Sequence, residues 1–585
     1  MTTALEQTWP ADDVPLLLLG EWCRLYERKA TWEKLDIQVT PYHWDDRGKL
    51  HRDYIYLQAL HEELLRELAE TLNQLHAVDH SIRYWRILAG PWLGYFVQIL
   101  FDRWECLRHA LATNDVSGVR VLSESRTPLV PNDMADFIRL FLSDEWNEAV
   151  YGQLLVAMGV QVEQISRGVE RSGSLPSPVV SSKWQQARGI MTRFASQISG
   201  VFCREDESFF ISSYLPLSLD LLLQLKSGQV PKVWRSVPVP ATSIDNAVRR
   251  WGSQALEDAT DFAAVARAML LRHIPRAYLE GYRSLVNVTE SIPWPKRPKV
   301  IFTSNSYSAD DTFKAWAAQK VESGTPLVIG QHGGNYGMAL WSFAEEHQIA
   351  ICDRFLTWGW SENNQDKVVP LGNLKGFGRR GAWNSNGVAL LVETTVPRTS
   401  YCMFSAPVAG QWLDYFEQQT VFISALPEAL RSQVLVRLYS SDFGWSQKQR
   451  WEDHFPEVRL EEGSQSMESL VKESRLYIST YNATTYLESM SLNIPTILFW
   501  NEKHWEIRES AQPFFEKLKA VGIFHESPES AALHMASIWN DVSSWWGSET
   551  VQAVRKEFCD SYAHIPEKPL TVLSRLFNEI STHYN

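Results

Sequence analysis

The stretch LYISTYNATTYLE, residues 476–488, decides the fold of the second half of the chain. Its first residues, 476–479, form a short apolar run that predicts a buried parallel strand. A polar turn then leads into a predicted helix at 484–492, and residues 495–500 predict the next strand. Strand, helix and strand in close succession are typical of a βαβ unit in a parallel sheet.

The polar turn in this stretch carries more hydroxyl and amide groups than a helix cap needs. Free N–H groups and a partial positive charge make a helix N-terminus favourable for phosphate. A carboxylate one turn further, Glu488, can reach ribose hydroxyls. An ordinary helix cap is the alternative interpretation, since Ser, Thr and Asn favour that position. We expect nucleotide binding by Ser479, Thr480, Asn482, Thr484, Thr485 and Glu488.

The alternation of strands and helices extends over both halves of the chain. Further strands are expected at residues 14–20, 118–122, 298–304, 325–329, 354–358, 388–392 and 434–439. Helices are expected at residues 57–75, 94–111, 313–321, 410–424 and 466–474. Residues 83–93 are interpreted as a strand or loop, and residues 132–284 as mostly helical.

This pattern predicts an α/β fold of the GT-B-like kind, with two Rossmann-like domains facing a cleft. Residues 1–366 would form the first domain, with a helical insertion at about 130–290, and residues 387–585 the second, nucleotide-binding domain. The polar, glycine-rich residues 367–386 are the expected linker. Because such domains bind ligands at the carboxyl ends of their strands, the cleft is the expected active site.

Composition excludes several classes of protein. The 585 residues are 45% hydrophobic and 21% charged, as in soluble globular proteins. A net charge of -13 argues against nucleic acid as a partner. Six scattered cysteines, no signal peptide and an apolar run too short to span a membrane indicate a cytoplasmic protein. The 25 tryptophans fit core packing, with sugar stacking or peripheral membrane contact as the alternative.

A second motif, GQHGGNYG at residues 330–337, follows a predicted strand. Its glycines permit positive φ and close approach of the backbone to a ligand. His332 is a candidate catalytic base, with a structural hydrogen bond as the alternative, and we expect substrate contacts from Gln331, Gly333 and Gly334. The motif is neither GxGxxG nor a P-loop, so dinucleotide and ATP-kinase functions are disfavoured.

Four carboxylates are candidates for the catalytic base or nucleophile that group transfer needs. Asp310 and Asp311 precede a predicted helix, so a helix cap is the alternative for them. Glu345 and Glu346 are neighbours whose side chains would point about 100° apart on a helix, so at most one faces the cleft. Solvated charges on a helix are the alternative for this second pair.

Weaker candidates lie elsewhere. Arg437, in a predicted strand, could hold a phosphate through its planar fork or form a structural salt bridge. Arg83 and Arg86 could contact an anionic acceptor or donor, and Glu393 follows the first strand of the second half. The sequence has no clean DxD between apolar strands, no HExxH and no GxSxG, so we expect no metal and no bound cofactor.

Four stretches carry a family resemblance: RYWRILAGPWL at 83–93, SNSYSADDTFKAW at 304–316, GQHGGNYG with the following EEH and LTWGW at 330–360, and STYNATTYLESMSLNIPTILFWN at 479–501. Together they resemble a bacterial family of surface-polysaccharide transferases found in O-antigen and capsule gene clusters. The last stretch is also similar to the turn of the β-Kdo and related nonulosonate transferases, GT-B-like enzymes that use CMP-activated acidic sugars.

The resemblance implies roles for the turn. Its Ser and Thr residues (Ser479, Thr480, Thr484 and Thr485) would hold the CMP phosphate, and Glu488 the ribose. Retaining β-Kdo enzymes form a covalent adduct with a carboxylate, which no motif places in this chain. The capsule enzymes carry a His-Pro motif, whereas this chain has GQHGGNYG.

The expected function is therefore that of a metal-independent glycosyltransferase. It would move a sugar, with a CMP-activated Kdo-like or nonulosonic acid such as pseudaminic acid as the implied donor, onto a bacterial surface polysaccharide or lipopolysaccharide. The nucleotide-sugar donor would bind the second domain, and a glycan or lipid-linked glycan acceptor the first, at the periphery of the inner membrane. A sugar-nucleotide epimerase of the same architecture and a non-catalytic glycan-assembly scaffold are the alternatives.

Overall fold

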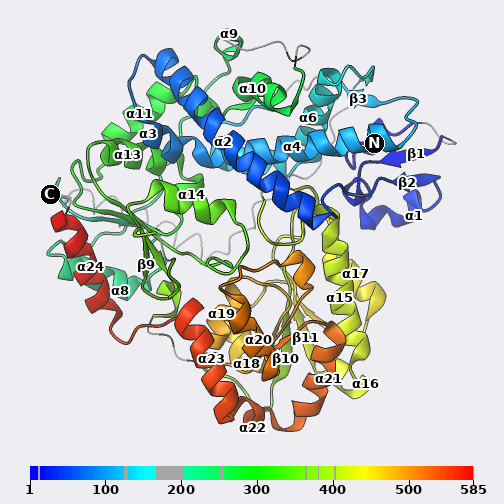
Figure 1. Ribbon diagram of the computed structural model, residues 1–585, viewed down its shortest axis with the longest axis vertical. Coiled ribbons are helices and arrows are strands. Elements are labelled where there is room, and N and C mark those ends of the chain that lie inside the picture. Colours follow the sequence, from blue (N-terminus) through cyan, green and yellow to red (C-terminus); the bar gives the residue numbers. More distant parts are fainter. Residues whose placement is uncertain are drawn as a thin grey trace.

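The computed structural model describes the chain except residues 11–13, 124–128, 167–202, 251–255, 257–258, 363–364, 378, 380, 401–402 and 584–585. It is an α/β protein with two larger parallel sheets, one in each half of the chain, and a layer of helices, most of them from the first 160 residues, lies across the top in Figure 1. The predicted α/β class with parallel sheets is confirmed. The domain boundaries inferred from the sequence stay a prediction.

A six-stranded parallel sheet organises the second half. Its strands are β10 (Val388–Val392), β11 (Val434–Arg437), β12 (Arg459–Glu461), β13 (Ser474–Ser479), β14 (Thr496–Phe499) and β15 (Phe524–His525). They lie in the order β12-β11-β10-β13-β14-β15, and every pairing is parallel. Numbered along the chain this order is 3-2-1-4-5-6, that of the Rossmann fold. The order reverses between β10 and β13, the point at which such sheets bind ligands.

Helices cover both faces of this sheet. α15 (Trp412–Ala425) packs against α21 (Pro528–Ile538), and α19 (Thr484–Ser491) and α20 (Gln512–Ala520) pack against α23 (Glu549–Tyr562). Other helices of this half are α16 (Glu428–Arg431), α17 (Gln447–His454), α18 (Met467–Glu473) and α22 (Val542–Gly547). Because both faces are covered, β13 and β14 are almost wholly buried and consist largely of apolar residues.

The first half contains a five-stranded parallel sheet whose order follows the chain. Its strands are β5 (Phe209–Ile211), β6 (Ile301–Thr303), β7 (Leu327–Gly330), β8 (Arg354–Thr357) and β9 (Val368–Pro370). Because successive strands are added in one direction, right-handed crossover connections place their helices on the same face of the sheet. The connecting helices include α11 (Tyr282–Ser291), α12 (Ser306–Ala309), α13 (Asp311–Glu322) and α14 (Phe343–Ile351). The sheet is therefore left with a second face to be covered.

The last helix of the chain covers that second face. α24 (Pro569–His583) returns to the first sheet and packs beside α8 (Leu217–Lys226), as Figure 1 shows at its left edge. Its apolar residues Leu573 and Phe577 join a core with Phe210 and Phe302 of the strands. The C-terminal segment, expected from the sequence to belong with the second half, thus contributes to the core of the first.

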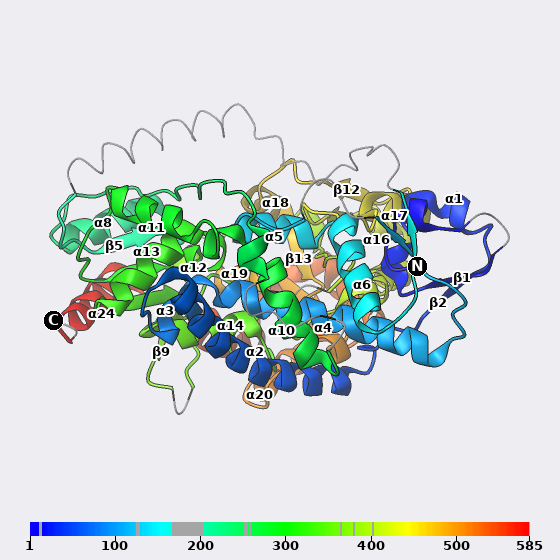
Figure 2. The same cartoon turned by 90° about the horizontal axis from the view of Figure 1, so that it is seen from above.

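The helical layer comes mainly from α2 (Arg47–His76), α3 (Ile82–Leu88), α4 (Gly90–Thr113), α5 (Met134–Phe141), α6 (Asp144–Ala157) and α10 (Phe262–His273). Figure 1 shows α2 crossing α4, with which it is in contact, and Figure 2 gives the view from above. α2 begins at Arg47, which pairs with Glu506 of the second half at 2.7 Å. The layer therefore contacts both halves. Among the described residues, no helix is both long enough and apolar enough to cross a membrane.

One sequence expectation was wrong in this region, and another was incomplete. Residues 83–93 are helical, because Ser81 caps α3 through the N–H of Tyr84 and Pro91 occupies the first turn of α4. Because α4 is buried on most sides, its sequence is a nearly continuous apolar run without the polar positions that mark a helix, and such a run resembles a buried strand. The range 132–284, expected to be mostly helical, also contains the strands β4 (Glu163–Ile165) and β5 (Phe209–Ile211), each with three residues, too few to show a strand period.

Two pairs of short parallel strands complete the fold. β1 (Leu16–Leu18) pairs with β2 (Ile37–Val39), and β3 (Arg120–Leu122) pairs with β4 (Glu163–Ile165). The strands expected at 14–20 and 118–122 are therefore confirmed, and the helices expected at 57–75 and 94–111 lie within α2 and α4.

Candidate functional site

The two motifs selected from the sequence are in direct contact. The glycine-rich loop at 330–337 follows β7, and the backbone N–H of Gly334 donates to Thr484 Oγ1 at 2.7 Å. Gly333 has φ +149°, and a Cβ placed on it would lie 2.3 Å from Thr484 Oγ1. Since Gly330 ends β7 and Ser479 ends β13, the carboxyl ends of two separate parallel strands meet here.

A pocket of about 460 Å³ lies beside α19. Its lining is Arg379, Gly381, Ala382, Met467, Glu468, Val471, Lys472, Tyr477, Thr485, Glu488, Ser489, Leu492 and Ile494. Among the residues predicted to bind nucleotide, Thr485 and Glu488 therefore face this pocket. The mixture of apolar side chains, among them Met467 and Val471 of α18, with a few charged groups is typical of small-molecule sites of this volume.

Two cations flank Glu488. Lys375 Nζ lies 3.9 Å from one carboxylate oxygen, and Arg379 Nη1 lies 3.9 Å from the other. Burial raises the pKa of Glu488, and the two cations lower it. No hydrogen bond to this carboxylate is formed by the described residues, so both oxygens can accept from ligand hydroxyls.

The first part of the turn is held by internal hydrogen bonds. Ser479 Oγ donates to the carbonyl of Tyr481 at 3.2 Å, and Thr480 Oγ1 donates to the carbonyl of Val392 at 3.0 Å. The second contact joins β13 to β10 at the point where the strand order reverses. Asn482 Oδ1 accepts from Tyr486 at 2.9 Å. These side chains fix the shape of the turn, and the amide nitrogen of Asn482 has no partner within the described structure.

His332 occupies the centre of the glycine-rich loop. Burial, with a smaller contribution from Lys375, lowers the pKa of its imidazole to about 4. The ring is therefore neutral at pH 7, and its buried Nδ1 has no partner in the part of the chain that the structure describes. Its neighbours Tyr214 and Tyr336 have ring centroids 6.2 and 5.6 Å away. A neutral imidazole of this kind can accept a proton.

The loop is anchored by Gln331. Its side-chain carbonyl accepts from the backbone N–H of Trp358 at 3.0 Å and from the indole of Trp360 at 2.9 Å. Its backbone carbonyl accepts from the Trp358 indole at 2.9 Å. Gln331, predicted to bind substrate, therefore joins the glycine-rich loop to the LTWGW segment, and the structure explains why the two motifs occur together.

Sequence reasoning missed Tyr214. The loop after β5 holds Ser212 at φ +48° and Tyr214 at φ +60°, a region that non-glycine residues seldom occupy. Such strain is concentrated at functional sites. The ring of Tyr214 lies 4.7 Å from Lys375 Nζ. No sequence signal marked this residue, because β5 itself was too short to be predicted.

Glu345 and Glu346 point to different neighbours, as their adjacent positions on α14 require. Glu345 forms a buried ion pair with Arg508 of the second half and accepts from the N–H of Gly337 at 2.8 Å. Glu346 accepts from the hydroxyl of Tyr54 at 2.5 Å. Both carboxylates are thus engaged in contacts that hold segments of the chain together.

The two aspartates differ. Asp311 is fully buried and bonded to Tyr278 at 2.6 Å and Lys314 at 2.6 Å. Asp310 caps α13 by accepting from the N–H of Phe313 at 3.0 Å, and burial raises the pKa of Asp310 to about 6. Among the described residues, Asp310 is the one of the four candidate carboxylates without an ion-pair or tyrosine partner.

The candidate arginines have carboxylate partners. Arg83 donates to Asp353 at 2.8 Å, beside the amino end of β8 and so at the edge of the sheet opposite the glycine-rich loop. Arg86 bonds both oxygens of Glu62, at 2.5 and 2.6 Å. Arg437 pairs with Glu461. These contacts support the structural alternatives, and the structure does not bring the three arginines to the pocket.

Glu393 lies directly after β10, where the strand order reverses. One oxygen accepts from the indole of Trp451 at 2.7 Å, and the other has no partner within the described structure. Burial raises the pKa of Glu393 to about 8. The residue is therefore a protonated, uncharged acid at pH 7, buried beside the turn.

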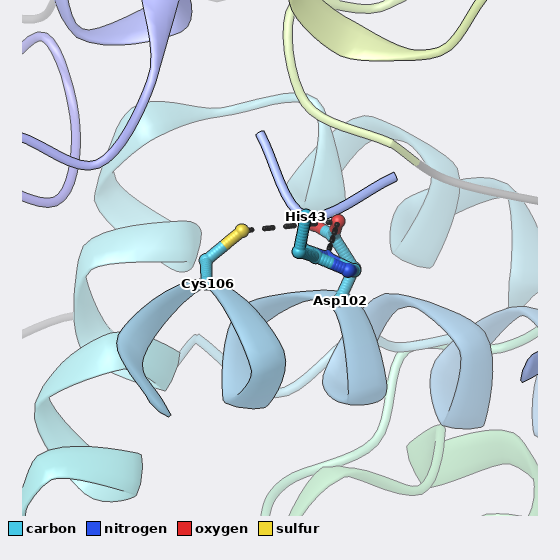
Figure 3. A group of neighbouring side chains, drawn as sticks. All are labelled: His43, Asp102 and Cys106. Atoms are coloured by element: carbon cyan, nitrogen blue, oxygen red, sulfur yellow. Dashed lines mark hydrogen bonds and ion pairs between the residues drawn. The ribbon is translucent and has the colours of Figure 1, made fainter. Parts of the chain in front are cut away.

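Figure 3 shows a group of metal-ligand type in the helical layer, His43, Asp102 and Cys106, whose ligand atoms lie within 4.8 Å of one another. Its neighbours disfavour a metal. Arg103 pairs with Asp102, and Lys49 Nζ lies 3.4 Å from His43 Nδ1. Burial raises the pKa of Cys106 well above its ordinary value, whereas metal binding needs the thiolate. The group is better explained as a hydrogen-bonded part of the core.

The fold and the site define an α/β protein of the Rossmann type with a candidate ligand pocket beside α18 and α19 in the second half of the chain. A family model described as LIC12162 family transferase matches residues 1–577, and the chain belongs to this family. The family name supports a transferase, in agreement with the class of enzyme expected from the sequence. No curated protein matches the chain.

Proposed function

We propose that this transferase is a GT-B-like glycosyltransferase that takes its sugar from a nucleotide-activated donor. The observation that carries the proposal is the contact between Gly334 and Thr484. It brings the loop with a neutral histidine against the start of α19, next to the pocket that contains Glu488. A base, an anion-favouring helix N-terminus and a nucleoside-sized pocket are thereby adjacent.

The nucleoside of the donor would occupy the pocket. Met467, Val471 and Leu492 offer an apolar surface for a base, and the unbonded carboxylate of Glu488 offers acceptors for the ribose hydroxyls. The phosphate would then lie toward the first turn of α19, where Thr484 and Thr485 stand.

His332 is the base in this proposal. Its neutral imidazole would take the proton of the acceptor hydroxyl as that oxygen attacks the sugar, while donors at α19 stabilise the charge that develops on the leaving phosphate. Asp310 supplies the carboxylate that a covalent, retaining route would need. The acceptor would approach from the first half of the chain.

The sequence resemblance supports a particular donor and acceptor. The turn at 479–488 is similar to that of transferases using CMP-activated acidic sugars, so the proposed donor is a CMP-linked Kdo-like or nonulosonic acid such as pseudaminic acid. The proposed acceptor is a growing bacterial surface polysaccharide or lipopolysaccharide, as a glycan or a lipid-linked glycan. A lipid-linked acceptor would hold the enzyme at the periphery of the inner membrane.

A nucleotide panel measured by thermal shift tests the proposal. A ligand present at 100 times its dissociation constant stabilises a protein by about 2.7 kcal/mol. We expect a clear response of the wild type to CMP. Glu488→Gln should weaken the affinity for CMP at least about tenfold. The control Glu457→Gln, at an exposed glutamate of the same half, should not weaken it. A response only to UDP or GDP would overturn the proposal of a CMP-linked donor. If the protein responds to no nucleotide at all, the proposal of a nucleotide-activated donor is overturned.

Incubation of the donor with and without acceptor separates the proposed activity from the alternatives. A glycosyltransferase extends the acceptor glycan, whereas an epimerase isomerises the sugar nucleotide without any acceptor. A scaffold retains its function in cells when both His332 and Glu488 are replaced by alanine. Loss of glycan extension in His332→Ala, with nucleotide binding retained, is the result expected for a base.

A further inference from the structure

The segment between the two sheets holds one lysine rigidly. Lys375 lies in a single turn of 3-10 helix, η6 (Leu374–Gly376), whose start is capped by Asn373. The Asn373 side chain accepts from the N–H of Lys375 at 3.0 Å, and its backbone donates to the carbonyl of His564 at 2.7 Å. Leu374 is buried in the core under the first sheet. The backbone at Lys375 is therefore anchored to the fold.

The ammonium group of Lys375 is poorly neutralised. Its side chain is 27% exposed, and its nearest carboxylate, Glu488, is 3.9 Å away. The described residues accept no hydrogen bond from its Nζ, although an ammonium has three donors. Its other close contact is the face of Tyr214, at 4.7 Å. Burial lowers the pKa of Lys375, as expected for a cation without a close partner.

The charges around Glu488 have a local excess of positive charge, which favours the binding of an anion. Lys375 and Arg379 both face the one carboxylate of Glu488. The other group that the sequence offered for phosphate, Arg437, is already paired with Glu461. The charge of Lys375 also lowers the pKa of His332, so the ammonium acts on the imidazole of the glycine-rich loop as well as on Glu488.

We propose that Lys375 binds the phosphate of the nucleotide, in the space between Glu488, His332 and the start of α19. This inference rests on the proposed function. If Glu488 accepts from the ribose, the 5′-phosphate is one sugar length away, toward Thr484 and Lys375. Arg379 lines the pocket itself and would serve the nucleoside.

The position of Lys375 gives it a role in the transfer step. A lysine acts as a point charge toward phosphate, and its charge would stabilise the leaving nucleotide as the bond between the anomeric carbon and the phosphate oxygen breaks. Because η6 belongs to the segment between the two sheets, this contact would tie donor binding in the second half to the first sheet.

Calorimetric titration with nucleotide and nucleoside pairs tests the inference. The pairs are CMP with cytidine, UMP with uridine and GMP with guanosine, and the proteins are wild type, Lys375→Met, Lys375→Arg and the control Lys448→Met, an exposed lysine of the second half. We expect Lys375→Met to weaken the nucleotide that wild type prefers by about tenfold or more, and to leave its nucleoside unchanged. Lys375→Arg should restore most of the affinity, and Lys448→Met should change neither ligand.

The outcomes separate the two proposals. If Lys375→Met weakens nucleotide and nucleoside equally, or neither, Lys375 does not bind the phosphate, and the proposed function stands. If wild type binds none of the six ligands, the nucleotide donor is wrong and this inference falls with it. A melting temperature of Lys375→Met within about 2 °C of wild type shows that any loss of binding is not a loss of folding.

Discussion

Gly334 and Thr484 are joined by a hydrogen bond of 2.7 Å from the backbone N–H of the first to the hydroxyl of the second. They are 150 residues apart in the chain and follow strands of two different sheets. Thr484 is also the first residue of α19, so the contact fixes the glycine-rich loop against a helix N-terminus. The proposed donor site therefore depends on how closely the glycine-rich loop and the start of α19 can approach each other.

Gly333→Ala is expected to disrupt this approach. The added Cβ would lie 2.3 Å from Thr484 Oγ1, and φ of +149° is unfavourable for a residue with a side chain. We expect nucleotide affinity to fall at least about tenfold in a titration. Gly324→Ala is the control, since it has φ +95° but nothing within 4 Å of the new Cβ. It should reduce the melting temperature without altering affinity.

A double mutant sharpens this prediction. Thr484→Ala removes the oxygen and the methyl group that the new Cβ would meet. In the double mutant Gly333→Ala/Thr484→Ala, the steric clash should be relieved. The destabilisation of the double mutant should therefore be smaller than the sum of the destabilisations of the two single mutants. Strict additivity would show that the close contact between the two residues does not restrict the loop.

Part of this candidate site could be predicted from the sequence, because some of its residues belong to recognisable local patterns. Thr484, Glu488 and His332 lie in short polar segments at the ends of apolar strands, a pattern visible without long-range contacts. Lys375 lies in a segment that has no periodicity, and its closeness to Glu488 arises only from folding. The helical layer was partly misread because buried helices lose the polar face that reveals their period.

His332 gives a pH dependence with a defined sign. Its pKa in the folded protein is about 4, below the ordinary value of 6.5, so the unfolded chain binds more protons between these values. Stability should therefore fall as the pH decreases from about 6.5 to 4. In His332→Gln this contribution disappears, and denaturant titrations at pH 7 and pH 4.5 should differ by less than in wild type. An unchanged difference would contradict the burial of a neutral imidazole.

Glu393 should act in the opposite direction. Its pKa is raised from 4.5 to about 8, so the folded protein binds more protons than the unfolded chain between these values. Stability should fall as the pH increases from about 4.5 to 8, because ionisation of the buried acid becomes favourable only on unfolding. Glu393→Gln keeps the shape without the ionisation, and it should gain at least about 1 kcal/mol relative to wild type between pH 5 and pH 8.

Urea titrations of both proteins at the two pH values measure that change. Asp414→Asn is a useful control, since burial raises its pKa too but its side chain lies on α15 and not after β10. The control should alter stability less, because Asp414 is less buried. If Glu393→Gln shows the same pH dependence as wild type, another group titrates in that range and Glu393 is ionised in the folded protein.

The ion pair between Glu345 and Arg508 should be the most sensitive contact between the two halves. Arg508 donates to the carbonyl of Ala339 at 2.8 Å as well, so it holds the end of the glycine-rich loop and α14 together. Arg508→Met would leave the buried carboxylate of Glu345 without its cationic partner, with only the N–H of Gly337 donating to it. Such a loss costs about 3–5 kcal/mol. Chemical denaturation of the variant should show a loss of this size.

A second substitution tests whether the loss of stability in Arg508→Met comes from the missing charge rather than from the missing length of the arginine side chain. Adding Glu345→Gln to Arg508→Met removes the unpaired carboxylate while the amide can still accept from the N–H of Gly337. The double variant should therefore be more stable than Arg508→Met alone, although it has lost one more charged group. The proposed glycan transfer should recover less than stability does, because the hydrogen bond from Arg508 to Ala339, at the end of the loop that carries His332, is still absent. Equal recovery of both would mean that the ion pair supports only the fold, and that the loop keeps its position without Arg508.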